Sequence, residues 1–600
     1  MTREPFRVER RDELLWVALD TPGAAVNIFD NRAAAQLSEV LASLEPDVKA
    51  VVLASDKAAS FVNGVGLLMA TTVRSPDDAR RLSSSVRGAY RDVREAGVLT
   101  VAAIRGTAYG CGVELALQCD LRIAADTFDT HFYMTELNDY LFNPVFGATV
   151  TLPLVLGLDR AAEFLLWGRR HGPTRARRVG LVHAVVDDGA FDEQVARLVR
   201  RQLGRGAVGR APVALRQDLD GIAARHGARI ARLPPSYRPV YRRCLALMKR
   251  VAQRGRITEA DREREVRLSG ESVARPASKG ALGFFFVRQT ADALCRGEGS
   301  DRVGIRSPSE HDAAGALVEV LAKRPLRGVT VRLGRRRRGS TEHDFVLVTS
   351  DSRERGGPER RVVVEGDLGQ RPTRGADLQL YSPMPEPPTV VELACSEPDP
   401  TTRVLYGTLS RFGLRVVVTH PRDRFAFDEL LAAHLAPIVK DALRGRSPRA
   451  IDADLCGFGF VRRVPALCHG LDSVALATLL TEHVDAPTGE VTRCLERLAK
   501  PLQAPRRTRQ RGRLLDALTL SWLDVALALR RHEVITHPTI VDVAAREVLD
   551  FPLGRGSFCR FLTRARIAEI LPRVAHNPLV DERAVGAALG YVEAGRDFYL

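Results

Sequence analysis

Residues 101–136 read VAAIRGTAYGCGVELALQCDLRIAADTFDTHFYMTE, and this stretch decides the fold. The apolar run at 101–104 is typical of a buried strand. Glycines interrupt it, among them Gly110 and Gly112, and residues 113–118 then read as the first turns of a helix. A glycine-rich turn that leads into a helix directs free backbone N–H groups and the positive end of the helix dipole to one place. The sequence therefore predicts a place that stabilises an anion.

Two carboxylates accompany the turn. Glu114 follows it directly, and Glu136 ends the next apolar stretch. The whole stretch resembles the crotonase (enoyl-CoA hydratase/isomerase) superfamily, whose pattern is roughly AAIxGxAxGGGxELALxCDxRIA followed by FxxPE. This chain has AAIRGTAYGCGVELALQCDLRIA and FYMTE at those places.

By this resemblance, Glu114 and Glu136 are the catalytic pair for hydration of a 2-enoyl thioester. In that reaction one carboxylate activates water and one carboxylic acid donates a proton to the α-carbon. Two nearby carboxyls in a low-dielectric pocket have their pKa values pushed apart, which allows the two roles. The alternative is that both are structural carboxylates, for instance residues near a helix N-terminus.

An earlier segment, SFVNGVGL at 60–67, resembles the family pattern FxxGADI. The resemblance assigns the backbone N–H groups of Val65 and Cys111 to an oxyanion hole, which stabilises the thioester oxygen as it gains enolate charge. Only backbone groups are needed, so the changed side chains are compatible with this role. The glycines assigned to substrate binding are Gly64, Gly110 and Gly112.

The chain departs from the family after Glu136. The family continues PEVxLGIxPGxGGTxRLPR, whereas this chain reads TELNDYLFNPVFGATVTLPLVLG. Thr135 replaces the proline, and Tyr140 and Phe146 are predicted to bind substrate by filling or reshaping the acyl pocket. Hydration, dehydration, isomerisation, decarboxylation and C–C cleavage all use this enolate chemistry, so the reaction stays open. Residues 76–98 are interpreted as a polar, mobile helical segment that covers the acyl chain.

The rest of the chain resembles the multifunctional fatty-acid oxidation α-subunits, in which a hydratase half is fused to a 3-hydroxyacyl-CoA dehydrogenase half. The segment YSPMPEPPTVVELA at 381–394 is similar to HFFNPVxxMxLVEVV of the dehydrogenases. Their catalytic histidine falls at Gln379 and its carboxylate partner at Glu392. A glutamine cannot act as the general base that takes the hydroxyl proton. No GxGxxG occurs in residues 303–378, so NAD is not expected and this half is predicted to be inactive.

The predicted fold class is α/β, with a crotonase ββα-spiral domain followed by a shortened Rossmann-like remnant and two mainly α-helical domains of the dehydrogenase type. The second helical domain is predicted to duplicate the first. The arginine run at 335–338 is interpreted as a solvated loop, with a phosphate site as the alternative. The predicted domains are 1–190 (crotonase), 191–302 (helical extension and linker helix), 303–394 (degenerate dinucleotide-binding-like region), 395–500 (first helical domain) and 510–600 (second helical domain).

Composition sets the class of protein. The 600 residues are 45% hydrophobic and 27% charged, which is typical of a soluble protein with several domains. No apolar run approaches the ~20 residues of a membrane span, and the charged N-terminus predicts no signal peptide. The nine cysteines form no CxxC pair and no zinc spacing. They are interpreted as reduced thiols of a cytoplasmic protein without a metal site.

The net charge of +16 comes mainly from arginine. We interpret it first as charge on solvated faces, next as attraction for the phosphates of coenzyme A, and last as nucleic-acid binding, because no binding motif is present. The predicted partners are an acyl-CoA or a carrier-bound acyl thioester, a homo-oligomer and a thiolase-like subunit, with no nucleic acid. Coenzyme A is expected only as part of the substrate, with no tightly bound cofactor.

Three functions remain open at this point. The first is an enoyl-CoA hydratase-like enzyme with an inactive dehydrogenase-like half. The second is a non-catalytic scaffold subunit of a fatty-acid oxidation-type complex. The third is a tailoring dehydratase or isomerase that acts on a carrier-bound chain in secondary metabolism.

Overall fold

A computed structural model gives the fold of two compact units, Met1–Leu282 and Gly283–Leu600, which are described separately below. The residues that the structure describes are 4–205, 218–295, 303–307, 329–333, 345–348, 360–365, 378–382, 390–395, 400–411, 414–420, 423–462, 464–468, 471–500, 512–574, 577–595 and 597–599. The arginine run at 335–338 lies outside them. The division at residue 282 is coarser than the five predicted domains, whose boundaries stay predictions.

The first unit is built on a six-stranded sheet with the order β1-β2-β3-β5-β7-β9. Only β1 is antiparallel to its neighbour, and the other pairs are parallel. The strands are β1 (Phe6–Arg11), β2 (Leu14–Leu19), β3 (Ala50–Ser55), β5 (Leu99–Ile104), β7 (Leu121–Ala125) and β9 (Ala184–Val186). The central strands β3, β5 and β7 are buried almost throughout, as their continuous apolar sequences require.

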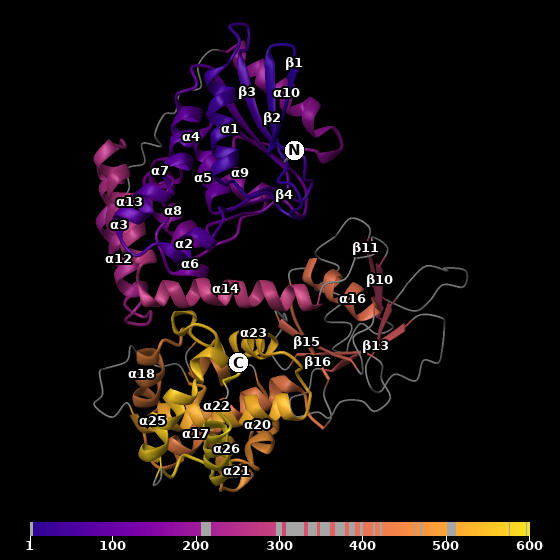
Figure 1. Cartoon of the computed structure of the whole chain (residues 1–600), viewed down its shortest axis with the longest axis vertical. Coiled ribbons are helices and arrows are strands. Elements are labelled where there is room, and N and C mark those ends of the chain that lie inside the picture. The colour runs from indigo at the N-terminus through magenta and orange to yellow at the C-terminus, as the bar shows by residue number, and fades with distance from the viewer. Residues whose placement is uncertain are drawn as a thin grey trace. The chain divides into compact units, whose positions relative to one another are not determined.

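A second, three-stranded parallel sheet stands in the order β4-β6-β8, with β4 (Ser60–Asn63), β6 (Thr107–Tyr109) and β8 (Phe132–Tyr133). Helices α1 and α4 lie beside the main sheet (Figure 1), and α10 packs Phe191, Val195 and Val199 into its core. The helices up to this point are α1 (Asn31–Ala42), α2 (Leu68–Thr72), α3 (Pro76–Leu82), α4 (Ser84–Arg94), α5 (Cys111–Gln118), α6 (Glu136–Tyr140), α7 (Ala148–Leu156), α8 (Leu158–Leu165), α9 (Pro173–Val179), η1 (Asp188–Ala190) and α10 (Phe191–Leu203).

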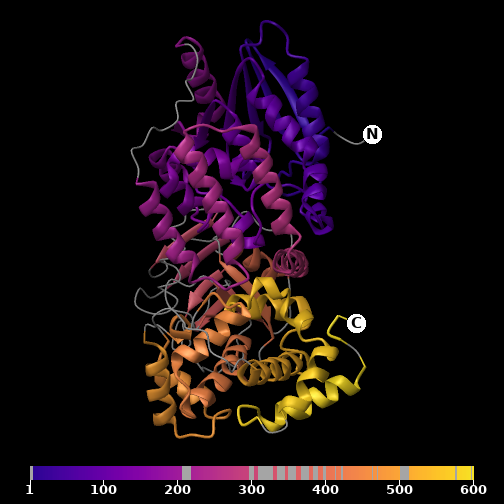
Figure 2. The same ribbon diagram turned by 90° about the vertical axis from the view of Figure 1, so that its left-hand side faces the viewer.

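Helices α11 (Leu219–Ile230), α12 (Arg238–Arg254) and α13 (Glu259–Val273) complete the first unit, and α14 (Pro276–Cys295) runs across the division between the units. In Figure 2 these helices are magenta. The helical structure is interrupted between α11 and α12, around Pro234 and Pro235, because proline lacks the amide N–H that a helix interior needs. Helix α12 packs on α7 and α11, and α13 packs on α3, α7 and α12.

The second unit opens with a seven-stranded sheet in the order β11-β10-β12-β13-β14-β15-β16. All neighbours are parallel except β14 and β15. The strands are β10 (Val303–Ser307), β11 (Val329–Leu333), β12 (Phe345–Val348), β13 (Arg360–Glu365), β14 (Leu378–Tyr381), β15 (Val390–Cys395) and β16 (Arg415–Thr419). This order is typical of a doubly wound sheet, and it includes β16, beyond the residue 394 where the predicted region ends.

The helical part of the second unit repeats one order of elements. Each copy begins with a long helix, of 18 residues in α17 and 20 in α22. A helix of 11 or 12 residues, a short helix and two further helices follow it. The long helices α17 and α22 pack together. This order fits the predicted duplication. The helices are α16 (Pro400–Arg411), α17 (Ala426–Leu443), α18 (Pro448–Phe458), α19 (Val464–Cys468), α20 (Ser473–Leu480), α21 (Thr488–Leu498), α22 (Gly512–Arg531), α23 (Pro538–Leu549), η2 (Leu553–Arg555), α24 (Phe558–Phe561), α25 (Arg564–Val574) and α26 (Glu582–Glu593).

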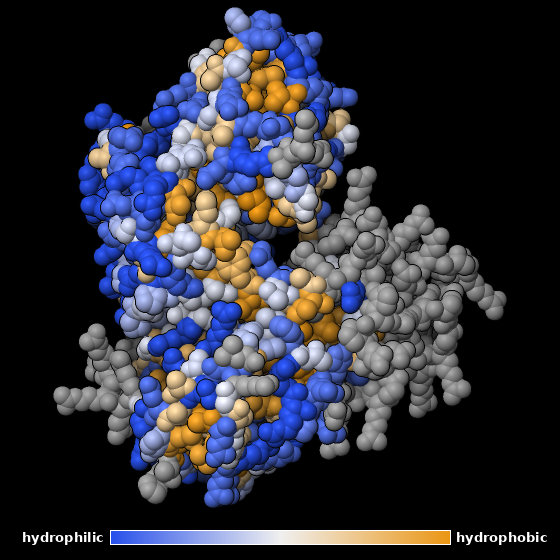
Figure 3. Space-filling model, in the orientation of Figure 1, coloured by the Kyte–Doolittle hydropathy of each residue, from blue (hydrophilic) through white to orange (hydrophobic). Residues whose placement is uncertain are grey.

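The predicted fold class is confirmed: a sheet-containing first unit is followed by a second unit that is mainly helical toward its C-terminus. On the face shown in Figure 3, hydrophilic residues cover much of the first unit. Many arginines of the first unit are paired with carboxylates, as Arg7 is with Asp56 and Arg80 with Glu263. Within the part of the chain that the structure describes, no helix combines the length and apolar character needed to cross a membrane. The side chains of eight cysteines are described, and all eight are buried free thiols.

Candidate functional site

The two predicted oxyanion amides follow two neighbouring strands. Strands β4 and β6 are parallel and their last residues, Asn63 and Tyr109, are paired in register. Val65 and Cys111 each come two residues later, so both N–H groups belong to turns at the same edge of the small sheet. The turns also touch, since the backbone of Gly64 hydrogen-bonds the Cys111 thiol.

The glycines in these turns have backbone and packing reasons to be glycine. Gly64 has φ of 108° and Gly110 has φ of 52°, a region that side chains disfavour. A Cβ on Gly112 would overlap the carbonyl oxygen of Val62, because α5 begins directly against β4. The sequence prediction of a tight turn feeding a helix is therefore confirmed, and the close approach explains why Gly112 carries no side chain.

Glu114 lies in the first turn of α5 and is fully buried. Its Oε1 accepts hydrogen bonds from the backbone amides of Phe146 at 3.0 Å and Ala148 at 2.9 Å. Its Oε2 has no hydrogen-bond partner among the described residues. One oxygen is thus fixed by the protein, and the other is buried without a hydrogen-bond partner among the described residues.

Glu136 is the first residue of α6, and 7% of it is exposed. Its Oε1 lies so close to the turn before α5 that a Cβ on Gly110 would be 2.7 Å away. Its Oε2 has no partner among the described residues. The structure therefore brings Glu136 to the same glycine turn that presents the Cys111 amide and begins the helix of Glu114.

Burial perturbs both carboxyls. Removal from water raises the pKa of Glu114 well above its usual range, and the charges of Glu136 and Glu265 raise it further. Burial also raises the pKa of Glu136 to about 7, with Asp139 and Glu265 adding to the shift and backbone amides opposing it. Both shifts favour the protonated form of the pair, and a protonated carboxyl beside an ionised one is the state that combined acid and base chemistry requires.

Tyr140 and Phe146 both lie near this pair and are largely buried, each 9% exposed. The Phe146 ring packs on Tyr90 with centroids 5.5 Å apart, while its amide holds Glu114. The Tyr140 ring stacks on Phe142 at the end of α6. Their role in shaping an acyl pocket stays a prediction.

Sequence reasoning missed Tyr90. Its hydroxyl donates to the Cys111 carbonyl at 2.7 Å, and its ring lies between Phe29 and Phe146. Residues 76–98, interpreted as a polar, mobile helical segment that covers the acyl chain, do form helices α3 and α4, while the mobility and the cover stay predictions. One face of α4 buries Val86, Ala89, Tyr90 and Val93. Their spacing of three and four residues is the signal that would have identified a packed helix face.

Sequence reasoning also missed Glu265, which lies on α13, far along the chain from the motifs. It is buried and its Oε1 accepts the Thr149 amide at 2.7 Å. A glutamate at that distance from the motif carries no local sequence signal.

The second unit contains the residues assigned to the dehydrogenase pair. In the β14–β15 register Tyr381 stands opposite Glu392, and Gln379 stands opposite Ala394. Glu392 is fully buried and accepts three hydrogen bonds, from Thr419 Oγ1 at 2.6 Å and from the amides of Ala426 and Phe427 at 2.9 Å each. Its carboxylate thus caps the first turn of α17.

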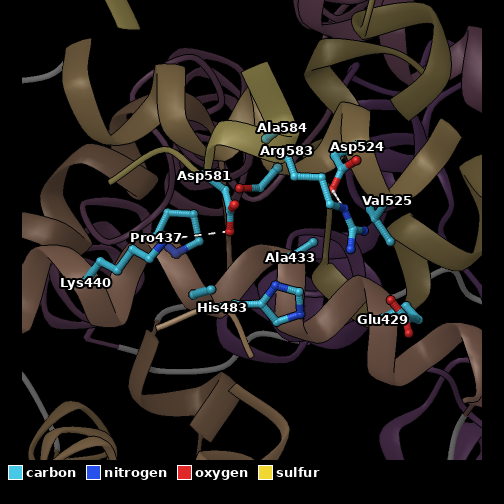
Figure 4. Close-up of a pocket in the computed structure, with 12 residues that line it drawn as sticks. Glu429, Ala433, Pro437, Lys440, His483, Asp524, Val525, Asp581, Arg583 and Ala584 are labelled. Carbon is cyan, nitrogen blue, oxygen red and sulfur yellow. Dashed lines mark hydrogen bonds and ion pairs between the residues drawn. The ribbon is translucent and has the colours of Figure 1, made fainter. Parts of the chain in front are cut away.

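A small cavity of about 30 Å³ lies between α17, α22 and the start of α26 in the second unit. Figure 4 shows Lys440 beside Asp581, and Asp524 beside Arg583. None of the predicted site residues lines it. Among the described residues, no cluster of three or more His, Cys, Asp or Glu suits a metal ion.

Comparison with known proteins locates the likeness in the N-terminal part. Residues 9–217 match the family Enoyl-CoA hydratase/isomerase. The Fatty acid oxidation complex subunit alpha of Shewanella frigidimarina is 31% identical over 199 residues, which are 33% of this chain and 28% of that protein. The same subunit of Shewanella amazonensis is 32% identical over 186 residues, 30% of this chain and 26% of its own length. The matched stretch therefore spans less than a third of these relatives.

Two solved structures described as an enoyl-CoA hydratase or a putative one are also similar to this chain. An enoyl-CoA hydratase from Bacillus anthracis is 25% identical with a TM-score of 0.31, covering 42% of this chain and 90% of that one. A putative enoyl-CoA hydratase from Streptomyces avermitilis is 19% identical with a TM-score of 0.35, covering 48% and 91%.

Proposed function

We propose that the enoyl-CoA hydratase/isomerase (crotonase) domain, which forms the N-terminal part of this chain, catalyses reversible hydration of a 2-enoyl thioester. The observation that carries the proposal is the meeting of Glu114, Glu136 and the two glycine turns in one buried place. Coenzyme A, or a carrier with the same thioester, enters as part of the substrate.

In the proposed reaction the thioester oxygen accepts hydrogen bonds from the Val65 and Cys111 amides. One glutamate takes a proton from water as the water oxygen bonds to the β-carbon. The electron pair of the C=C bond moves to the α-carbon and onto the thioester oxygen, and the other glutamate gives its proton to the α-carbon. Each amide donor is worth about 3 kcal/mol of transition-state stabilisation in comparable sites.

We further propose that the second unit has no dehydrogenase activity and that NAD is not a cofactor. Gln379 stands where a catalytic base is needed, and a glutamine takes no proton. The Glu392 carboxylate, which would orient such a base, is fully occupied by Thr419 and by the first turn of α17. A role for this unit in support of the hydratase domain or of a thiolase-like subunit, a homo-oligomeric state and a cytoplasmic location belong to the same proposal.

The test is turnover of crotonyl-CoA and of a longer 2-enoyl-CoA, followed by loss of the enoyl thioester absorbance. Glu114→Gln and Glu136→Gln are each expected to lower kcat by about 10²–10⁴-fold, because each removes a proton-transferring group of similar size. Glu39→Gln on the exposed side of α1 is the matched control and is expected to change nothing.

The same assay with 3-hydroxyacyl-CoA and NAD is expected to give no NADH. Hydration that survives both substitutions would refute the assignment of the pair. Absence of turnover with coenzyme A binding intact would mean another thioester reaction at the same site. Absence of both turnover and binding, with a thiolase-like protein co-purifying, would favour the scaffold function.

A further inference from the structure

Helix α13 places a third buried carboxyl group beside the proposed pair. Glu265 lies in the middle of this helix, is 2% exposed and faces α7. Helix α13 follows the stretch that matches the family, which ends at residue 217. Glu265 therefore lies outside the stretch that matches the family.

Two carboxyls from distant helices share the N-terminus of α7. Glu114 accepts the Ala148 amide at 2.9 Å, and Glu265 accepts the next amide, that of Thr149, at 2.7 Å. Glu265 also receives hydrogen bonds from the Thr149 hydroxyl and the Gly147 backbone. The residue before α7 is Gly147, so no side chain of the local sequence caps this helix. Glu265 thus accepts the amide that directly follows one of the two amides held by Glu114.

The position of Glu265 has an electrostatic cost that a simple helix cap does not need. Burial raises its pKa to about 7. Its charge in turn raises the pKa of Glu114 and of Glu136. A serine, threonine or asparagine cap would satisfy the same amides without placing a third carboxyl in this environment.

Several titratable or charged groups interact electrostatically with Glu265 or lie on the helices around it. Glu114 and Glu136 face it from α5 and α6, Arg262 precedes it by one turn on α13 and opposes its charge, and Cys244 faces it from α12. On the α3 and α4 side, Arg80 and Arg87 are paired with Glu263. Other charged groups on α3, α12 and α13 include Asp77, Asp78, Arg81, Arg250, Arg254 and Asp261.

We propose that Glu265 is a positioning residue for Glu114, which holds the first turn of α7 in place and adds a third buried carboxyl beside the Glu114–Glu136 pair. The inference rests on the proposed function, since it assumes that this pair performs the chemistry. It extends the site beyond the motif residues to helix α13.

The first measurement is the pH profile of hydration in the full chain. Glu265→Gln keeps an oxygen that accepts the Thr149 amide but removes the charge. Because that charge raises the pKa of both catalytic glutamates, its removal is expected to displace the whole profile to lower pH, by about one unit, with at least a tenfold loss of turnover on the alkaline side. Glu265→Ala removes the hydrogen bonds as well and is expected to lower kcat at every pH.

The matched control is Glu263→Gln, two residues away on the same helix, where the carboxylate is partly exposed and paired with Arg80 and Arg87. Its profile is expected to coincide with that of the wild type. A Glu265→Gln profile that also coincides with the wild type, whatever its kcat, would overturn the inference, because a purely structural residue changes the rate and leaves the pH dependence in place.

A second readout does not need turnover. Infrared difference spectra recorded across pH report protonated buried carboxyls through their C=O stretch. Glu265→Gln is expected to remove one such band and to displace the titration of the remaining ones to lower pH. If the wild type turns over but the displacement is not seen, the Glu265 inference is refuted and the proposed function is not. If the displacement is seen but the wild type has no turnover, the proposed function is refuted, while the interaction between the three carboxyls is supported.

Discussion

Replacement of Glu392 by alanine is expected to destabilise the second unit by about 3–6 kcal/mol. The substitution leaves the Thr419 hydroxyl and the amides of Ala426 and Phe427 without their acceptor. Each buried donor that loses its partner costs about 1–3 kcal/mol. Three such donors give a range of about 3–9 kcal/mol. Water that enters the space left by the side chain offsets part of the loss, so the expected value lies in the lower half of that range.

Glu392→Gln separates the hydrogen bonds from the charge. Burial raises the pKa of Glu392 to about 7, from 4.5 in an unfolded chain. A carboxyl with a raised folded-state pKa contributes stability that is fully present below the unfolded value and is lost as the pH rises through the folded value. The difference between 4.5 and about 7 corresponds to about 3 kcal/mol, which the wild type loses between pH 4.5 and pH 8 and the glutamine variant does not.

The glutamine variant is therefore expected to be about 1–3 kcal/mol less stable than the wild type near pH 5 and about equal to it near pH 8. Urea unfolding followed by the fluorescence of Trp522 measures the second unit, once Trp16 and Trp167 of the first unit are replaced by phenylalanine. Glu482→Gln, whose side chain is 64% exposed, is the control and is expected to change stability by less than about 0.5 kcal/mol. An unchanged unfolding midpoint in Glu392→Ala would refute the reasoning that this carboxylate holds α17.

Two further predictions concern the first unit. Gly112→Ala is expected to lower the melting temperature and to reduce hydration more than 100-fold, because the added Cβ meets the Val62 carbonyl. Gly172→Ala is the control and is expected to have little effect, because open space surrounds Gly172. Equal behaviour of the two variants in melting and turnover would contradict this. Tyr90→Phe removes the hydroxyl that donates to the buried Cys111 carbonyl, so we expect a loss of about 1–2 kcal/mol and a fall in kcat of about tenfold with KM nearly unchanged. A kcat equal to the wild type in steady-state assays would show that the tyrosine does not orient this peptide.

The motif residues of the first unit were predictable because their geometry is local. A strand, a glycine turn and a helix lie within 20 residues, so the order of residue types alone places Glu114 in the first turn of α5 and Cys111 at its start. The match of residues 9–217 to the Enoyl-CoA hydratase/isomerase family confirms the resemblance on which these assignments rest. The roles assigned to the residues stay predictions until they are measured.

Tyr90 and Glu265 were not predictable in this way. Each acts through a tertiary contact that the surrounding sequence does not encode, with a backbone carbonyl in one case and a helix N-terminus in the other. The second unit shows a related limit. The absence of a glycine fingerprint predicted a reduced region, yet the strands from β10 to β14 form a parallel sheet, because sheet pairing depends on strand pattern and not on cofactor-binding residues.

Eight cysteines have described side chains, and because all eight are buried their reactivity can report internal motion of the chain. Cys111, Cys119 and Cys244 lie in the first unit, and the other five lie in the second. A thiol reagent in native buffer reacts only when a segment opens, so mass spectrometry of labelled peptides gives a separate opening rate for each unit. In such an experiment Cys111 would monitor the oxyanion turn itself, and a bound thioester would register as protection of a single sulfur atom.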